Sequence, residues 1–481
     1  MKNQLKVKDL SSKIVVRKEL LLSTIILGLF NLLLLVESVR ANMDYSSGRF
    51  QLFMDEQITF DGVRNILHPE SIFMFFYSVL DGGDQRYGRL LWNISAVAAF
   101  IPEKLFGETG QIVATRAVSV LLLLVAAALL ARTFGRRPYA IALIYTTTLS
   151  LPFVSYYITM PKPEPLQLLL LSILAYRIIE KSDNGTTGLY LLLGMLLGVK
   201  ISSLPLLLPF IFWLTRKSSK DQVANPNWVS RRLGAFCLGL GITVPTLLPF
   251  LGVFTLFTFL WERHLKGMKA PALTFMGTLS FSALISLTLG RFFEILLGRN
   301  FLMNYVNYTI LGTSSGSDSQ DVTPVSWIRY FLSDWNSLPF LPSILFLLSL
   351  TLIIFGLIKN RKFYSQKVEV YVFVAAGVLS ILLTFLNVQR IWGFYLFIGA
   401  SIFAASTIGL ISEWVTTHRL GKHTKFAYAI FVGLVIWSTT VSLKNNIEIL
   451  QSQSMRTQSE EYRIQFKSYE TIRSTIILYT K

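Results

Sequence analysis

The apolar residues of this chain come in long blocks instead of recurring every three or four positions. A helix that crosses a bilayer needs roughly 20 mostly apolar residues, because lipid offers its backbone no hydrogen-bond partner. Blocks of about this length lie at 20–39, 112–131, 338–358, 370–386, 391–414 and 426–443. Together with shorter apolar runs, they predict an all-α, polytopic transmembrane helix bundle of about 10–12 helices.

The composition points the same way. Of the 481 residues, 52% are hydrophobic and only 15% are charged, and the mean hydropathy is +0.53. A soluble domain usually carries about 25% charged residues. A soluble globular fold is therefore disfavoured.

The net charge of +18 is concentrated in short loops beside the apolar blocks. Basic clusters lie before residue 20 and within 132–137, 216–232, 359–367 and 419–425. Positive charge at helix ends marks the cytoplasmic side of a membrane. We therefore expect residues 1–19 to be cytoplasmic, 20–443 to form the transmembrane domain, and the polar tail 444–481 to be extracytoplasmic.

This distribution of charge indicates a multi-pass membrane protein, and we expect it in a bacterial inner (plasma) membrane. The basic excess is then a topology signal, with a secondary attraction to anionic membrane lipids. No nucleic-acid partner is expected.

The segment 40–110 differs from the basic loops, because it holds nine acidic residues against six basic ones. Its apolar runs, such as 72–77, are rich in aromatic residues and too short to span. Such runs are typical of helices that lie in the membrane interface. We expect this segment to be a long first extracytoplasmic loop with interfacial helices.

Lys200 interrupts the apolar run 188–214 near its middle. In a single spanning helix, a central lysine would cost about 2.5–3.5 kcal/mol on insertion scales. A single crossing would also place Arg216 and Lys217 outside. The sequence therefore favours two short helices that meet at Lys200 on the extracytoplasmic side.

The charge pattern assigns a few acids and bases to the same outer face. Asp55 and Glu56 lie in the first loop, Glu164 lies in a proline-rich turn, and Lys200 and Arg390 lie at helix ends. A carboxylate can take a proton from an attacking hydroxyl, while Lys and Arg bind phosphate oxygens. This set would suit a substrate with a phosphate and a hydroxyl.

Each residue also has a purely structural interpretation. Asp55 could cap a helix, and Glu164 could pair with the neighbouring Lys162. Lys200 could extend its amine to the interface, and Arg390 could anchor its helix to lipid headgroups.

Four motifs in order resemble the GT-C superfamily of integral-membrane glycosyltransferases, which use polyprenyl-phosphate-linked sugars. They are LFMDEQITFDG at 52–62, PKPEPLQLLLL at 161–171, LLLGMLLGVKISSLPLLLP at 191–209 and QRIWGFYLFIG at 389–399. The resemblance covers most of the helical body, and its weight comes from the order and common side of the motifs. The last motif departs from an Arg-Tyr-x-Leu-Pro pattern frequent in the family.

The resemblance implies an inverting glycosyltransferase with its active site at the outer membrane surface. It implies that Asp55, with Glu56 beside it, is the catalytic base. It maps the acid of the second outer loop to Glu164, and a basic residue that handles the lipid phosphate to Lys200 or Arg390.

The expected partners are a polyprenyl-phosphate-linked sugar and an acceptor hydroxyl on a glycan, lipid or protein. In the run 81–89, Arg86 and Arg89 are further candidate ligands for phosphate or sugar, with a surface turn as their structural interpretation. No metal site is predicted, although Asp55 and Glu56 together could hold a divalent cation.

Other functions remain open at this stage. A transporter or flippase for a lipid-linked or anionic substrate would place ionisable residues deep in its helices. A polysaccharide polymerase or ligase would share the substrate class and rely on Arg and His. A structural membrane scaffold is a further alternative, but it would not explain why these acids and bases are all assigned to the outer face.

Overall fold

The computed structural model describes residues 20–36, 54–80, 88–151, 154–180, 187–200, 203–221, 228–244, 367–387, 396–417 and 422–456, with a few isolated positions and very short runs between 251 and 358. Most of the predicted span 338–358 lies outside these residues. Every element of the described part is an α-helix. The all-α prediction is thus confirmed there, while the full number of helices stays a prediction.

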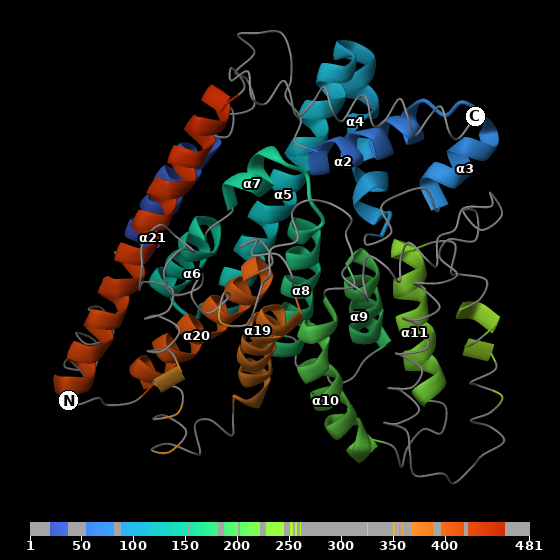
Figure 1. The fold of residues 1–481 in the computed structure, drawn as a ribbon. Helices are drawn as coiled ribbons and strands as arrows, with labels where there is room; N and C mark the ends of the chain where they lie inside the picture. Colours follow the sequence, from blue (N-terminus) through green and yellow to red (C-terminus); the bar gives the residue numbers. More distant parts are fainter. Residues whose placement is uncertain are drawn as a thin grey trace, which may run out of the picture.

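The first described helix lies at Leu20–Val36. After it, in chain order, come α2 (Met54–Leu67), α3 (Ile72–Leu80), α4 (Leu90–Phe106), α5 (Glu108–Phe134), α6 (Pro138–Ser150), α7 (Val154–Thr159), α8 (Glu164–Ile179), α9 (Thr187–Val199), α10 (Leu204–Asp221), α11 (Trp228–Thr243), α19 (Val368–Asn387), α20 (Phe397–Thr417) and α21 (Lys422–Arg456) (Figure 1).

Two described helices are long and apolar enough to cross a membrane, namely Glu108–Phe134 and Phe397–Thr416. Shorter apolar helices occur at Leu20–Val36, Thr187–Val199 and Val368–Leu382. Both long helices overlap blocks that the sequence predicts to span. Helix α21 continues without interruption past residue 443, so the predicted start of the polar tail falls inside a helix.

Helix α5 lies at the centre of the bundle and packs against α4, α6 and α8. Its buried face is built from Leu123, Leu130 and small alanines between them. The rings of Phe210 and Phe134 both meet Phe373 edge-on, at 4.7 and 5.5 Å, and join α10, α5 and α19. These contacts belong to one contiguous hydrophobic core, which fixes the positions of the helices relative to one another.

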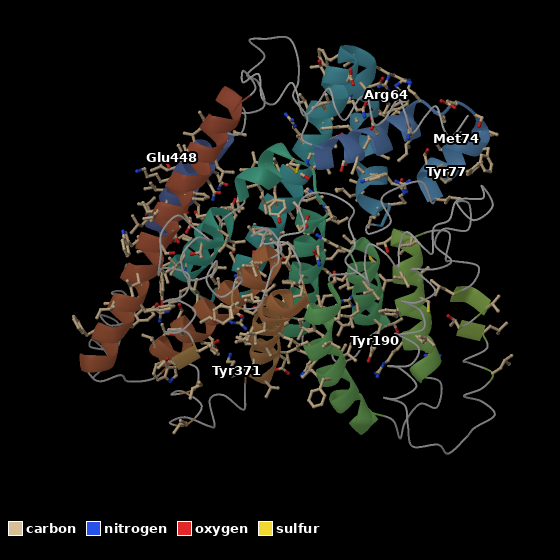
Figure 2. The ribbon with its side chains drawn as sticks, viewed as in Figure 1. Arg64, Met74, Tyr77, Tyr190, Tyr371 and Glu448 are labelled. Carbon is tan, nitrogen blue, oxygen red and sulfur yellow. The ribbon has the colours of Figure 1, made fainter. Side chains whose placement is uncertain are left out.

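The bundle has two chemically different ends. Helices α2, α3, α4 and α7 gather at the upper end in Figure 1. In Figure 2, Met74 and Tyr77 of α3 lie at this end, whereas Tyr190 and Tyr371, near the starts of α9 and α19, lie toward the other. We call these the first-loop end and the basic end.

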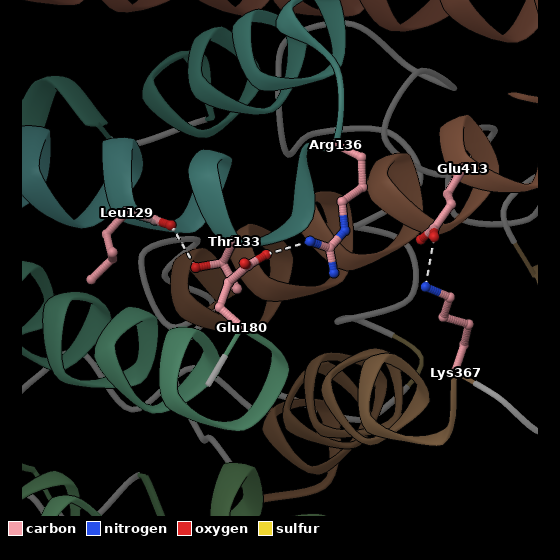
Figure 3. Close-up of polar contacts among 6 residues, drawn as sticks. All are labelled: Leu129, Thr133, Arg136, Glu180, Lys367 and Glu413. Carbon is pink, nitrogen blue, oxygen red and sulfur yellow. Dashed lines mark hydrogen bonds and ion pairs between the residues drawn. The ribbon is translucent and has the colours of Figure 1, made fainter. Parts of the chain in front are cut away.

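The basic end carries the basic turns that the sequence predicts to be cytoplasmic. Arg136, in the turn after α5, pairs with Glu180 at 2.6 Å, and Lys367 pairs with Glu413 of α20 at 2.6 Å (Figure 3). Which end faces the cytoplasm stays a prediction.

Helices α3 and α4 expose large apolar side chains. Ile72, Phe73 and Phe76 of α3 are exposed, as are Val97 and Phe106 of α4. The run 72–77 is helical, as an interfacial segment would be. Its contact with a membrane stays a prediction.

The predicted break at Lys200 is confirmed. Helix α9 ends at Val199 and α10 begins at Leu204. Two short helices, rather than one long one, therefore carry the run 188–214.

Candidate functional site

Glu164 begins helix α8 in a turn shaped by prolines. Pro161 and Pro163 separate α7 from α8, and Pro165 lies in the first turn, where a missing N–H costs nothing. A carboxylate in this turn is favoured by the partial positive charge of the helix N-terminus. Glu164 is 2% exposed, so its charge is held inside the protein.

Lys200 lies against this carboxylate. Its Nζ donates to Oε1 of Glu164 in a buried ion pair that joins residues 36 positions apart. Within the described residues, Oε2 of Glu164 has no hydrogen-bond partner. The structure thus brings together two of the predicted site residues, and it gives Glu164 a partner other than the neighbouring Lys162.

A second polar pair lies one helical turn further along. Gln167 Nε2 donates to Ser203 Oγ at 2.5 Å, again across 36 positions. Ser203 Oγ donates in turn to the carbonyl oxygen of Leu196 at 2.8 Å. Sequence reasoning missed Gln167 and Ser203. Gln167 lies three positions after Glu164, and Ser203 lies three positions after Lys200. Residues at this spacing on a helix are neighbours, and this spacing was the signal that could have identified both.

Glycines bring α9 and α11 into close contact. A Cβ added to Gly194 would clash with the backbone oxygen of Phe236, and one on Gly198 would clash with Thr243. Small residues allow such approach between helices. The last turns of α9 and α11 therefore lie side by side, and α9 ends immediately before Lys200.

The first loop caps both of these helix ends. The backbone N–H of Gly88 donates to Val199 O at 3.2 Å, and that of Arg89 donates to Thr243 O at 2.7 Å. Gly88 has no room for a Cβ, because Gly198 O and Thr243 O lie too close. The segment before α4 is thereby fixed against the residue that precedes Lys200.

Arg89 is buried, at 4% exposure, and its guanidinium carbon lies 4.2 Å from the centre of the Trp92 ring. The surface-turn interpretation is therefore wrong for Arg89. Arg86 and Arg390 lie outside the described residues.

Helix α2 contacts the proline-rich turn. Thr59 Oγ1 donates to Pro161 O at 3.2 Å, and Gln111 Nε2 of α5 donates to Phe60 O at 3.0 Å. Asp55 and Glu56 lie in the first turn of α2, about one turn before Thr59. Their side chains are outside the described part of the structure, so their roles stay predictions.

The buried charges of the described chain are mostly positive. The charged residues buried there are Arg89, Arg116, Lys162, Glu164 and Lys200. Arg116 lies in the first third of α5, in the same helix as Gln111, which donates to Phe60 O of α2. Sequence reasoning missed Arg116 and considered Lys162 only as a local partner of Glu164, because the sequence alone does not show how deeply a basic side chain is buried.

Within the described residues, no group of three or more His, Cys, Asp or Glu side chains is arranged to hold a metal ion. The proposed cation ligands Asp55 and Glu56 are not covered by this observation, since their side chains are not described.

No protein-family model matches the chain, and neither does any curated protein sequence. Among solved structures, the apo oligosaccharyltransferase of Archaeoglobus fulgidus is 14% identical with a TM-score of 0.48, and the similarity covers 90% of this chain and 56% of that one. Apo ArnT from Cupriavidus metallidurans is 12% identical with a TM-score of 0.40, covering 89% and 77%.

A second structure of the Archaeoglobus oligosaccharyltransferase, tethered to an acceptor peptide with an NVT sequon, is 14% identical with a TM-score of 0.41. The chain spans little more than half of that enzyme, 55% in this structure. These are proteins of the GT-C superfamily that the sequence motifs resemble. With TM-scores below 0.5, the similarities carry no argument for function, which has to come from the residues of the site.

Proposed function

We propose that the chain is an integral-membrane glycosyltransferase of the GT-C type. It moves a sugar from a polyprenyl-phosphate donor to an acceptor hydroxyl at the extracytoplasmic face, with inversion at the anomeric carbon. The observation that carries this proposal is the buried ion pair of Glu164 and Lys200, which lies beside the proline-rich turn that α2 contacts.

Buried bases suit an anionic substrate. The charged residues that are buried in the described part of the chain are four bases, Arg89, Arg116, Lys162 and Lys200, and one acid, Glu164. A phosphate in a site poor in water interacts strongly with Arg and Lys. The donor phosphate is therefore a fitting ligand for this group.

The proposed base is Asp55, with Glu56 beside it. The contact of Thr59 with Pro161 brings α2 against the turn that leads to Glu164, which supports a shared site. Asp55 takes the proton of the acceptor hydroxyl as its oxygen attacks the anomeric carbon. The bond from that carbon to the phosphate oxygen breaks, and the polyprenyl phosphate leaves with the electron pair.

Lys200 and Arg390 stabilise the charge that develops on the departing phosphate. Glu164 holds Lys200 in place, and its second oxygen is available to a hydroxyl of the substrate. Arg89 and Arg86 are further ligands for the phosphate or the sugar. The apolar helices α5 and α20 support the placement of the chain in a membrane.

The test is transfer of radiolabelled sugar from a polyprenyl-phosphate donor in membranes that contain the protein. Replacing Asp55 with Asn and Glu56 with Gln should abolish transfer while leaving the amount of folded protein unchanged. Asp61→Asn, in the same helix, is the matched control and should retain activity. Undiminished transfer by the Asp55→Asn, Glu56→Gln variant would rule out this mechanism.

A further inference from the structure

The turn that carries Lys200 is held from two sides. On one side, Lys200 itself pairs with Glu164. On the other, Ser203 donates its backbone N–H to Lys200 O at 2.9 Å and its hydroxyl to Leu196 O at 2.8 Å. Ser203 thus ties the start of α10 to the last turn of α9, with Lys200 between them.

Gln167 connects this turn to α8. Its side-chain N–H donates to Ser203 Oγ, so Ser203 accepts from α8 while it donates to α9. Gln167 and Ser203 are both buried, at 2% and 0% exposure. Loss of either hydrogen bond would therefore leave a buried polar group without a partner, which costs free energy. Gln167 also lies three residues after Glu164 on the same helix, so α8 contacts the Lys200 turn at two points.

We infer that Gln167, acting through Ser203, is a positioning residue for Lys200. The second contact prevents the turn from rotating about the Glu164–Lys200 pair. Lys200 is thereby kept at one place relative to α8, where the proposed reaction needs a fixed positive charge. This role deepens the proposed function and rests on it for its catalytic consequence, while the structural link does not depend on the reaction.

The first experiment measures the position of Lys200 without any assay of activity. Purified full-length protein in detergent is treated with a limiting amount of acetic anhydride, and acetylation of each lysine is followed by mass spectrometry. The variants are Gln167→Met and Ser203→Ala. Ser172→Ala is the matched control, because Ser172 is a buried serine of α8 whose hydroxyl, among the described residues, bonds within its own helix, to Leu168 O at 2.7 Å.

We expect Lys200 to be acetylated several times faster in Gln167→Met and Ser203→Ala than in the wild type, and unchanged in Ser172→Ala. Lys367, which pairs with Glu413 at the basic end, should react equally in all of them. An unchanged rate at Lys200 overturns the inference, whatever the protein catalyses. Faster reaction at Lys367 as well would indicate general loosening and overturn it too.

The second experiment is a double-mutant cycle on sugar transfer. Alone, Gln167→Met should lower kcat by about tenfold to a hundredfold, the scale of a small displacement of a catalytic group, with little change in KM. In the Lys200→Met background it should cause no further loss. A full additional loss in that background contradicts a role through Lys200. Absence of transfer by the wild type would refute the proposed function alone, because the acetylation result decides the positioning role separately.

Discussion

Helix α8 has an ion pair at each end, and the two pairs lie in very different surroundings. Glu164, at its N-terminus, pairs with Lys200, and the two side chains are 3% and 8% exposed. Glu180, directly after its C-terminus, pairs with Arg136, and those side chains are 24% and 45% exposed. The pairs are separated by a helix of 16 residues, about 24 Å.

The difference lies in what surrounds each pair. At the first-loop end, Gly88 and Arg89 cap α9 and α11, and α2 contacts the proline-rich turn, so several elements cover the charges. At the basic end, a turn and a helix end meet at the surface (Figure 3). The same two charge types therefore form a buried ion pair at one end of α8 and a partly exposed one at the other.

The largest effect is expected from Lys200→Met. The change leaves Glu164 buried without its ion partner, which should cost about 3–5 kcal/mol of unfolding free energy. Denaturant titration in detergent micelles measures it. The matched control is Glu164→Leu with Lys200→Met, which removes both charges and should recover most of the stability but not the proposed sugar transfer. Equal loss in both variants would contradict a buried, mutually compensating pair.

The next effect concerns the contact that places Lys200 at the end of α9. Gly194→Ala puts a methyl group into the backbone of Phe236, so α9 and α11 must separate, at a cost of about 1–3 kcal/mol. Gly433→Ala, in α21, is the control, because a Cβ there has nothing within 4 Å. Alanine is the better helix former, so this control should be neutral or slightly stabilising. Thermal unfolding midpoints of the two variants should differ in this direction, and equal midpoints would contradict the close packing.

A smaller effect is expected from Thr59→Val. It removes the hydrogen bond between α2 and Pro161 O and should cost about 1–2 kcal/mol, because a buried carbonyl loses its donor. Thr133→Val is the control at the basic end, because in the described structure the Thr133 hydroxyl donates to Leu129 O of its own helix (Figure 3). Sugar transfer should fall in the first variant and persist in the second. Equal sugar transfer by both variants would show that the contact of α2 with Pro161 does not contribute to the proposed site.

The smallest effect is expected from Arg136→Ala. A partly exposed ion pair contributes about 0–1 kcal/mol, and added salt screens it. The unfolding free energy should change by less than for any variant above, and by less still in high salt. A loss as large as that of Lys200→Met would show that exposure does not distinguish the two ends.

The helices could be predicted because their signals are local. Blocks of apolar residues, the prolines at 161–165 and the charge of Lys200 each act within one or two helical turns. The break between α9 and α10 follows from them, since a lysine at the centre of a spanning helix is unfavourable. The site residues were only partly predictable. Glu164 and Lys200 stood out as charges in apolar sequence, whereas Gln167 and Ser203 did not.

By itself, the sequence determined which segments are apolar helices, where they break, and which loops carry basic charge. Only the tertiary structure decided that Lys200 meets Glu164, that Arg89 is buried against Trp92, and that α9 and α11 end side by side under Gly88. These contacts join residues far apart in the chain. They depend on the register in which whole helices pack, and that register is set by many contacts at once, among them the glycines of α9 and α11.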